Sequence, residues 1–171
     1  MKRKIILSCF LLIIASILFA CKANNPIVPA NNNIIYENSF ETASELSDFG
    51  FTENIDSVSG HYGKKSIIVH GGIYEQVSMH KIVASDSGSY LLSCWIKTFT
   101  QGQAGLYLQR GNSNIAVRGS IITTKTSSWE YCIGDSAMQF NKGDTISICI
   151  DHGGCTAEKW IDYIEVFKPD K

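Results

Sequence analysis

The segment Gly88-Ser89-Tyr90-Leu91-Leu92-Ser93-Cys94-Trp95-Ile96-Lys97 decides the fold of this chain. Side chains alternate between the two faces of a β-strand, so the residues at positions 90, 92, 94 and 96 share one face. These four residues are tyrosine, leucine, cysteine and isoleucine, which suit a core. The opposite face carries leucine, serine, tryptophan and lysine. The pattern predicts a strand with one buried face and one mixed polar and aromatic face, where a sheet could meet a ligand.

Runs of the same kind recur from Ile34 onward between clusters of Gly, Ser, Asn and Asp. The predicted strands are Ser66–His70, Ile73–Val77, Tyr90–Thr98, Gly105–Arg110, Ile115–Thr123, Trp129–Ile133, Thr145–Ile150 and Trp160–Phe167. The only helix candidate is a single turn over Thr42–Leu46. Eight or more strands in about 135 residues predict an all-β domain, a two-sheet antiparallel β-sandwich of the jelly-roll type.

The N-terminus has the pattern of an export signal. A basic stretch, Lys2-Arg3-Lys4, precedes the apolar run Ile5–Ala20, which as a helix spans about 24 Å, less than the roughly 30 Å of a bilayer core. This favours a removable signal peptide over a membrane span. Leu18-Phe19-Ala20-Cys21 resembles the bacterial lipobox, in which the cysteine becomes acylated. We therefore expect residues 1–20 to be a lipoprotein signal peptide and Cys21 to carry the lipid.

Residues 21–33 are predicted to form a lipidated, flexible tether, because Lys22–Asn33 is polar, carries two prolines and has no periodicity. Residues 34–171 are predicted to form the β-sandwich binding domain. The whole chain has 15 basic and 16 acidic residues. The first 20 residues contain three of the basic residues and none of the acidic ones, so the mature chain would have a net charge of −4. An acidic chain without a basic cluster is not expected to bind nucleic acid.

Membrane attachment is therefore expected through acyl chains rather than through charge. The expected location is the cell envelope, with the protein lipid-anchored to the outer membrane or the cell surface.

Five segments, taken in order, resemble the carbohydrate-binding modules of the galactose-binding-like jelly-roll superfamily. These segments are Glu37–Glu41, Gly63–Ile67, Gly88–Lys97, Ser128–Tyr131 and Trp160–Val166. The resemblance implies a jelly roll that binds glycans without cleaving them, on a concave sheet face or at loop tips. It also implies a structural calcium ion, which many such modules carry.

In such modules the opening segment and the closing strand meet at the ion. The resemblance implies Glu41 and Asp162 as the carboxylate ligands here, with backbone carbonyls near Lys64 and Ser66. Calcium takes roughly six to eight oxygen ligands, so two carboxylates need carbonyls and water beside them. The alternative is that both carboxylates cap turns or pair with lysines, with no metal.

A pyranose ring has an apolar C–H face that can lie on an aromatic ring while polar neighbours bind its hydroxyls. Trp95, Tyr107 and Tyr74 are the candidates for such a platform. Gln109 and Lys97 are the candidates for hydroxyl contacts. The alternative is that Trp95 is covered by a loop or lies in a second core layer.

Four cysteines besides Cys21 would remain in an exported chain, namely Cys94, Cys132, Cys149 and Cys155. Cys149 and Cys155 flank a short Gly-rich segment and are the candidate disulfide. Pairing of Cys94 with Cys132 stays open, because sequence does not set connectivity. Adding His152 gives zinc-like spacing but only three ligands, where a closed site takes four.

The sequence contains no HExxH, Gly-x-Ser-x-Gly, phosphate-loop or dinucleotide motif, which speaks against an enzyme. The leading interpretation is a glycan-binding lipoprotein without catalytic activity. The alternative is a structural or adhesion lipoprotein that contacts a protein partner. A small hydrolase using a pair such as Asp151 and Asp162 would need an enclosed cleft with tuned carboxyl groups.

Overall fold

The computed structural model describes residues 33–52, 57–70, 77–111, 117–152 and 158–169. The chain divides into two compact units, Met1–Ala30 and Asn31–Lys171, and every described residue belongs to the second. Within the described ranges no helix has the length and apolarity that a membrane crossing requires. The signal peptide, the lipidated Cys21 and most of the tether lie outside the described residues and stay predictions.

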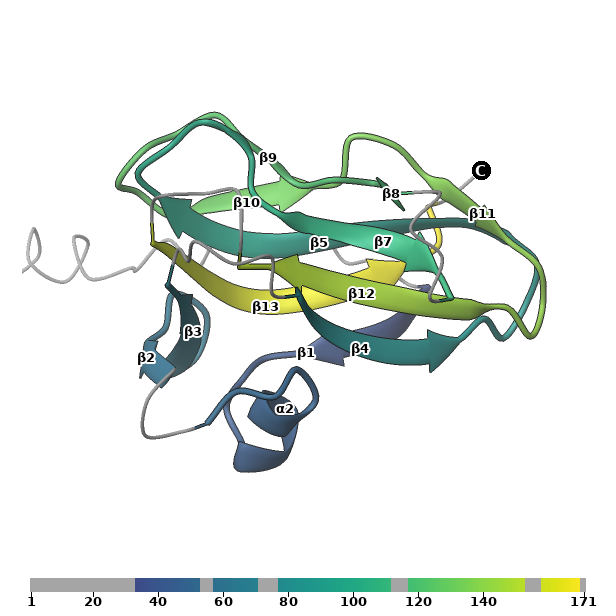
Figure 1. Cartoon of the computed structure of the whole chain (residues 1–171), viewed down its shortest axis with the longest axis horizontal. Helices are drawn as coiled ribbons and strands as arrows, with labels where there is room; N and C mark the ends of the chain where they lie inside the picture. The colour runs from purple at the N-terminus through teal and green to yellow at the C-terminus, as the bar shows by residue number, and fades with distance from the viewer. Residues whose placement is uncertain (1–32, 53–56, 71–76, 112–116, 153–157, 170–171) are drawn as a thin grey trace, which may run out of the picture. The chain divides into compact units, whose positions relative to one another are not determined.

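The described unit is an antiparallel β-sandwich of the jelly-roll type, as predicted (Figure 1). The large sheet runs in the order β10-β5-β13-β3-β2, with β1 paired to β13 and β11 paired to β5. Its strands are β1 (Ile34–Asn38), β2 (Ser57–Ser59), β3 (Lys65–Val69), β5 (Gly88–Thr98), β10 (Glu130–Ile133), β11 (Met138–Phe140) and β13 (Lys159–Phe167).

The small sheet runs in the order β4-β12-β7-β8, over the strands β4 (Val77–Val83), β12 (Thr145–Asp151), β7 (Leu106–Arg110) and β8 (Val117–Arg118). A short pair joins β6 (Gly102–Gln103) to β9 (Ile122–Thr123). All strand pairs within the described residues are antiparallel.

The core lies between the two sheets, on the faces that alternation predicts. In β5 the side chains of Tyr90, Leu92, Cys94 and Ile96 are all fully buried. Fully buried aliphatic side chains of the small sheet belong to the same core cluster, namely Leu106, Leu108, Ile146, Ile148 and Ile150. Burial of apolar surface contributes about 25 cal/mol per Å², so this layer is the main source of stability.

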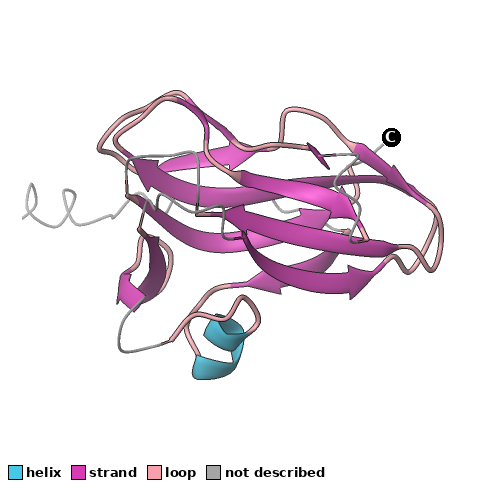
Figure 2. Ribbon diagram, in the orientation of Figure 1, coloured by secondary structure: helices cyan, strands magenta, loops and turns pink. Residues whose placement is uncertain are grey.

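The helix turn predicted over Thr42–Leu46 is present as α2 (Ala43–Ser47), drawn in cyan in Figure 2. Thr42 is the N-cap: its hydroxyl accepts a hydrogen bond from the Glu45 N–H, and the Glu45 carboxylate accepts one from the Thr42 N–H. This reciprocal capping box satisfies two backbone donors that a helix start otherwise leaves free. Leu46 is fully buried and joins the core cluster.

One strand prediction needs correction, and a second lies almost wholly outside the described residues. The described part of Ile115–Thr123 forms β8 and β9, which belong to different sheets, because the chain turns at Gly119, where φ is 68°. Of Ile73–Val77 only Val77 is described, and it begins β4, which continues to Val83. The short strands β1, β2, β6 and β11 have too little alternation for the sequence to predict them.

A bulge in β13 shapes the face of the large sheet that points away from the small sheet, here called the outer face. The register with β5 shifts between Asp162 and Glu165, and Tyr163 between them has a φ of 48°. Asp162 pairs with Trp95 and Glu165 pairs with Ser93. Directly paired residues share a face, so both carboxylates lie on the outer face.

Candidate functional site

The loop of residues 60–64 joins β2 to β3 and is held against the outer face by Asp162. The Oδ2 atom of Asp162 accepts hydrogen bonds from the N–H groups of His61, at 2.7 Å, and Tyr62, at 2.6 Å. Asp162 itself is fully buried. Burial raises the pKa of Asp162 to about 6, although the N–H groups of Tyr62 and His61 act in the opposite direction. Asp162 thereby fixes the backbone of the 60–64 loop at His61 and Tyr62.

Glu41 holds the other end of the same loop. Its Oε1 atom accepts hydrogen bonds from the N–H groups of Lys64, at 2.6 Å, and Lys65, at 2.9 Å. Gly63 has a φ of 83°, and a Cβ at this position would lie 2.4 Å from Glu41 Oε1. The positive φ favours glycine at this position, and a larger side chain would also have to displace the Glu41 carboxylate. The loop is held from the start and from the end of the domain, by residues that lie far apart in sequence.

His61 covers Trp95, which corrects the expectation of an exposed indole. The Trp95 side chain is only 7% exposed. Its ring centroid lies 4.3 Å from that of His61 and 5.4 Å from that of Tyr131, and the His61 ring lies 5.4 Å from Trp129. The outer face therefore has a second packed layer of rings over β5, and Trp95 does not provide a free stacking surface.

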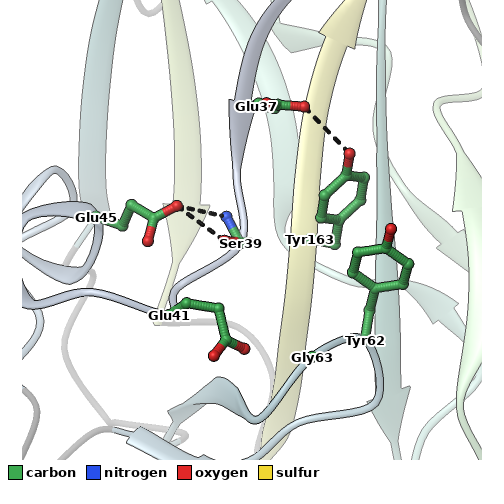
Figure 3. A pocket seen from close by; sticks show the side chains of 7 residues that line it. All are labelled: Glu37, Ser39, Glu41, Glu45, Tyr62, Gly63 and Tyr163. Carbon is green, nitrogen blue, oxygen red and sulfur yellow. Dashed lines mark hydrogen bonds between the residues drawn. The ribbon is translucent and has the colours of Figure 1, made fainter.

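On its other side the 60–64 loop borders a pocket of about 220 Å³, here called the tyrosine pocket. Its lining residues are Glu37, Ser39, Glu41, Glu45, Tyr62, Gly63 and Tyr163 (Figure 3). The rings of Tyr62 and Tyr163 lie side by side, with centroids 4.5 Å apart and planes at 47°. Tyr62 is 39% exposed, so part of its ring is open to solvent. The pocket thus joins an accessible aromatic surface to a set of carboxylates.

Two of the pocket's glutamates are oriented by hydrogen bonds shown in Figure 3. The Tyr163 hydroxyl donates to Glu37 Oε2 at 3.1 Å. Glu45 Oε1 accepts hydrogen bonds from the N–H and hydroxyl groups of Ser39. Burial alone would raise the pKa of Glu45, but the hydrogen bonds from Thr42 and Ser39 outweigh it and hold the pKa below its ordinary value. Glu45 is therefore ionised at neutral pH.

The chemistry of the pocket suits a ligand that donates several hydrogen bonds. Among the described residues, its charged lining side chains are all glutamates, and none is basic. An ionised carboxylate has only acceptor sites, so it pairs with hydroxyl or amine donors and not with anions. An aromatic ring beside such acceptors matches the two surfaces of a sugar, which has an apolar C–H face and an equatorial set of hydroxyls.

A second exposed feature of the outer face is an aromatic patch formed by Lys97, Phe99 and Trp160. Phe99 is 54% exposed, and its ring meets that of Trp160 edge-on with centroids 5.5 Å apart. The ammonium group of Lys97 lies 5.1 Å from the centre of the Trp160 ring. Trp160 is half-buried, so part of its ring remains on the surface.

The residues predicted to form one sugar platform lie on two sheets. Trp95 and Lys97 belong to β5 of the large sheet, whereas Tyr107 and Gln109 belong to β7 of the small sheet. Gln109 is only 5% exposed, and its Oε1 accepts a hydrogen bond from Cys149 Sγ at 3.5 Å. The outer faces of the two sheets of a sandwich point in opposite directions, so these four residues do not form a shared surface.

Two further predictions fall partly or wholly outside the described residues. Tyr74 lies outside them, and so does Cys155, the expected partner of Cys149. Cys149 is a buried free thiol within the described residues.

Four buried polar atoms, all on or beside the outer face, have no hydrogen-bond partner within the described part of the chain. These atoms are His61 Nε2, Trp95 Nε1, Asp162 Oδ1 and Glu165 Oε1. The other oxygen of Glu165 accepts hydrogen bonds from the hydroxyl groups of Ser93 and Tyr131. Burial raises the pKa of Glu165, against the lowering effect of these two donors. An unpartnered buried polar atom costs about 1–3 kcal/mol, so this region favours a bound water or ion.

The residues predicted to bind calcium meet at the 60–64 loop, but they bind the loop itself. Glu41 and Asp162 each direct one oxygen at two backbone N–H groups, and the Lys64 carbonyl accepts the Gly60 N–H at 3.1 Å. The Ser66 side chain is buried and donates to the Ser59 carbonyl. The described residues contain no group of three or more His, Cys, Asp or Glu side chains that could hold a metal ion. One feature fits a cation, namely the unpartnered Asp162 Oδ1.

Sequence reasoning missed the tyrosine pocket. Tyr62 lies in a turn, Tyr163 projects from the bulge, and Glu37 and Glu45 come from β1 and α2, so no single strand pattern unites them. The available signal in the sequence was the segment His61-Tyr62-Gly63, in which an aromatic residue precedes a glycine. In the structure this glycine has a positive φ and forms a turn. Periodicity does not show which face such a loop covers.

No protein-family model matches the sequence, and no curated protein matches it significantly. Solved structures of three carbohydrate-binding modules are similar in fold. The CBM22-1 xylan-binding domain from Paenibacillus barcinonensis is 14% identical with a TM-score of 0.54, and the match covers 81% of this chain and 97% of that one. A family 6 module from Clostridium cellulolyticum, solved with xylose, is 9% identical with a TM-score of 0.52 and coverage of 78% and 97%.

A β-1,3-glucan-binding family 6 module from Bacillus halodurans is 13% identical with a TM-score of 0.50, and the match covers 67% of this chain and 84% of that one. At such low identities the likeness concerns the fold. The chain has the jelly-roll fold of carbohydrate-binding modules, as the resemblance of its sequence segments implies.

Proposed function

We propose that this chain, which has the fold of carbohydrate-binding modules, binds a glycan in the tyrosine pocket without cleaving it. The observation that carries the proposal is the pairing of a partly exposed Tyr62 ring with the carboxylates of a concave pocket. The three structural neighbours described above are a xylan-binding domain, a module solved in complex with xylose and a β-1,3-glucan-binding module. These neighbours support neutral, hydroxyl-rich sugars as the ligand class.

The expected binding mode follows from the geometry of the pocket. The open part of the Tyr62 ring would stack on the C–H face of one sugar residue. Glu37 and Glu41 would accept hydrogen bonds from its hydroxyl groups, since both line the pocket beside Tyr62. One stacked ring and a few hydrogen bonds give weak affinity, so the expected dissociation constant is about 0.1–1 mM.

No feature of the pocket calls for catalysis. Glycoside hydrolysis needs a general acid and a second carboxylate on opposite sides of the scissile bond. In the tyrosine pocket Glu45 is committed to the capping of α2, and its low pKa does not suit a general acid.

The experiment is a glycan array probed with the full chain in mild detergent, followed by calorimetric titration of the best ligand. Tyr62→Ala is expected to weaken binding about tenfold, which corresponds to about 1.4 kcal/mol. The matched control is Tyr107→Ala, because Tyr107 is a partly buried tyrosine on the small sheet. Retained affinity in Tyr62→Ala together with loss in Tyr107→Ala would move the site to the small sheet.

Contact with a protein partner remains the second candidate function, and the aromatic patch is the observation that favours it. Exposed aromatic rings such as Phe99 are enriched in protein interfaces. This function would be favoured if the chain bound no glycan on the array but captured one defined protein, and if Phe99→Ala abolished that capture. Loss of glycan binding in Phe99→Ala would instead extend the sugar site to the patch.

The proposal includes attachment to a bacterial membrane through lipid on Cys21, which places the domain in the cell envelope. Metabolic labelling with a palmitate analogue is expected to label the chain, and Cys21→Ala is expected to abolish the label. Labelling that persists in Cys21→Ala would contradict the anchor.

We also propose that a structural calcium ion binds at Glu41 and Asp162. Its support is the unpartnered buried oxygen Asp162 Oδ1. Calcium would tie the 60–64 loop to both ends of the domain, so its removal is expected to lower the melting temperature by several degrees. An unchanged melting temperature in chelator would leave the N–H bonds to Glu41 and Asp162 as the only hold on the loop.

A further inference from the structure

Cys94 and Cys132 lie directly opposite each other on neighbouring strands of the large sheet. Strand β10 pairs with β5 in an antiparallel register that sets Cys132 against Cys94. Paired residues project to the same face, and both side chains belong to the hydrophobic core. Cys94 is fully buried and Cys132 is 5% exposed. In this structure both are free thiols.

The hydrogen-bond pattern between the strands gives the spacing of this pair. The Gly134 N–H donates to the Leu92 carbonyl at 2.8 Å, two positions further along both strands. Hydrogen-bonded and non-hydrogen-bonded pairs alternate in an antiparallel ladder, so Cys94 and Cys132 also form a hydrogen-bonded pair. The Cα atoms of such a pair are about 5.5 Å apart, which is within the range of disulfides.

The Cβ atoms set the strain. In a hydrogen-bonded pair the distance between the two Cβ atoms is about 5.5 Å, the upper end of the range for cross-strand pairs, whereas a disulfide needs a Cβ–Cβ distance of about 3.5–4.5 Å. Closing the bond therefore requires a shift of about 1 Å. Strand β10 can supply this shift, because it is four residues long and, among the described strands, lies at the edge of the sheet and pairs with β5 alone. The bond would form, but it would store strain.

The third described cysteine is not a competitor. Cys149 alternates with Ile148 and Ile150, which face the core, so its side chain lies on the far face of the small sheet. Its thiol donates to Gln109 Oε1. The Cys94 and Cys132 thiols are therefore partners for each other and not for Cys149.

We propose that Cys94 and Cys132 are a redox-responsive pair that forms a strained cross-strand disulfide. In the oxidation the two thiols give up two electrons and two protons to the disulfide bond of an oxidant such as glutathione disulfide. An Sγ–Sγ bond forms, and the oxidant leaves as two thiols. Because strain favours the reduced state, the bond is reducible by glutathione, unlike an unstrained structural disulfide.

The rate of this exchange is limited by access to the thiols. Burial raises the pKa of the Cys94 thiol, and it raises the pKa of the Cys132 thiol to about 12. The thiolate is the reacting species, so exchange waits for β10 to open. The pair thus keeps its redox state during a short exposure to an oxidant or a reductant and changes it only during a long one.

The test equilibrates the full chain in mild detergent with oxidised or reduced glutathione, then blocks free thiols under denaturing conditions. A non-reduced digest analysed by mass spectrometry is expected to show a peptide cross-linked through Cys94 and Cys132 in the oxidised sample, lighter by two hydrogen masses. Incubation with millimolar reduced glutathione is expected to remove the cross-link.

Cys149→Ala is the matched control and should keep the cross-link, whereas Cys132→Ala should lose it. If Cys132→Ala does not fold, the digest of the unaltered chain decides alone. Free Cys94 and Cys132 after equilibration with oxidised glutathione would overturn the proposal. A cross-link that resists reduced glutathione would overturn it equally, because the strain argument would then be wrong.

Discussion

Replacement of Trp95 by alanine tests whether its indole is a packing residue or a ligand platform. The side chain is 7% exposed and is packed between the rings of His61 and Tyr131. A buried tryptophan removes roughly 200 Å² from water, worth about 5 kcal/mol at about 25 cal/mol per Å². Measured Trp→Ala losses in protein cores are about 3–5 kcal/mol, so we expect the free energy of unfolding to fall by about 4 kcal/mol.

The assay is urea unfolding of the full chain in detergent, followed by far-UV circular dichroism, which does not depend on tryptophan fluorescence. Trp160→Ala is the control, because Trp160 is half-buried at the surface and should cost about 1 kcal/mol. Trp95→Phe should cost less than Trp95→Ala, because it keeps a ring and removes the unpartnered Nε1 atom. The reasoning would be refuted by a Trp95→Ala variant that is as stable as the unaltered chain yet no longer binds glycan.

Three further predictions concern stability. Glu45→Ala removes half of the capping box of α2 and the four hydrogen bonds that the Glu45 carboxylate accepts. We expect urea unfolding to show that the free energy of unfolding falls by about 1–2 kcal/mol, and an unchanged value would contradict the role of Glu45 in the cap. Lys159→Met leaves the carbonyls of Ala104 and Asp151 without the buried ammonium group that binds both. Thermal unfolding should therefore show that the free energy of unfolding falls by about 2–4 kcal/mol, and an unchanged melting temperature would count against this contact. Glu165 has a raised pKa in the folded state, so its ionisation opposes folding, and the protein loses stability as pH rises through that pKa. Glu165→Gln should therefore gain stability relative to the unaltered chain as pH rises. Parallel curves of stability against pH for the two proteins would rule this out.

Local patterns predict the elements that bury one face. The alternation from Tyr90 to Ile96 predicts the inward face of β5, and all four inward residues are fully buried. The capping pair Thr42 and Glu45 similarly accounts for α2. In both cases the physical cause lies within a few residues of the chain, so the sequence alone carries it.

The candidate site depends on contacts between distant residues, and here the sequence-based predictions were wrong or incomplete. Trp95 and Tyr107 have similar strand patterns, but periodicity does not encode strand order, which puts them on different sheets. The covering of Trp95 by His61 depends on Asp162, which lies 101 residues from His61 and accepts its N–H. Tyr163 reaches the pocket only because β13 has a bulge.

We propose that a glycan binds on the outer face of the large sheet, in the tyrosine pocket. Amide chemical-shift mapping of the full chain with the best array ligand tests it most directly. We predict that the shifts concentrate at the 60–64 loop, Glu37 and Tyr163. Shifts confined to the small sheet around Tyr107 and Gln109 would contradict the account.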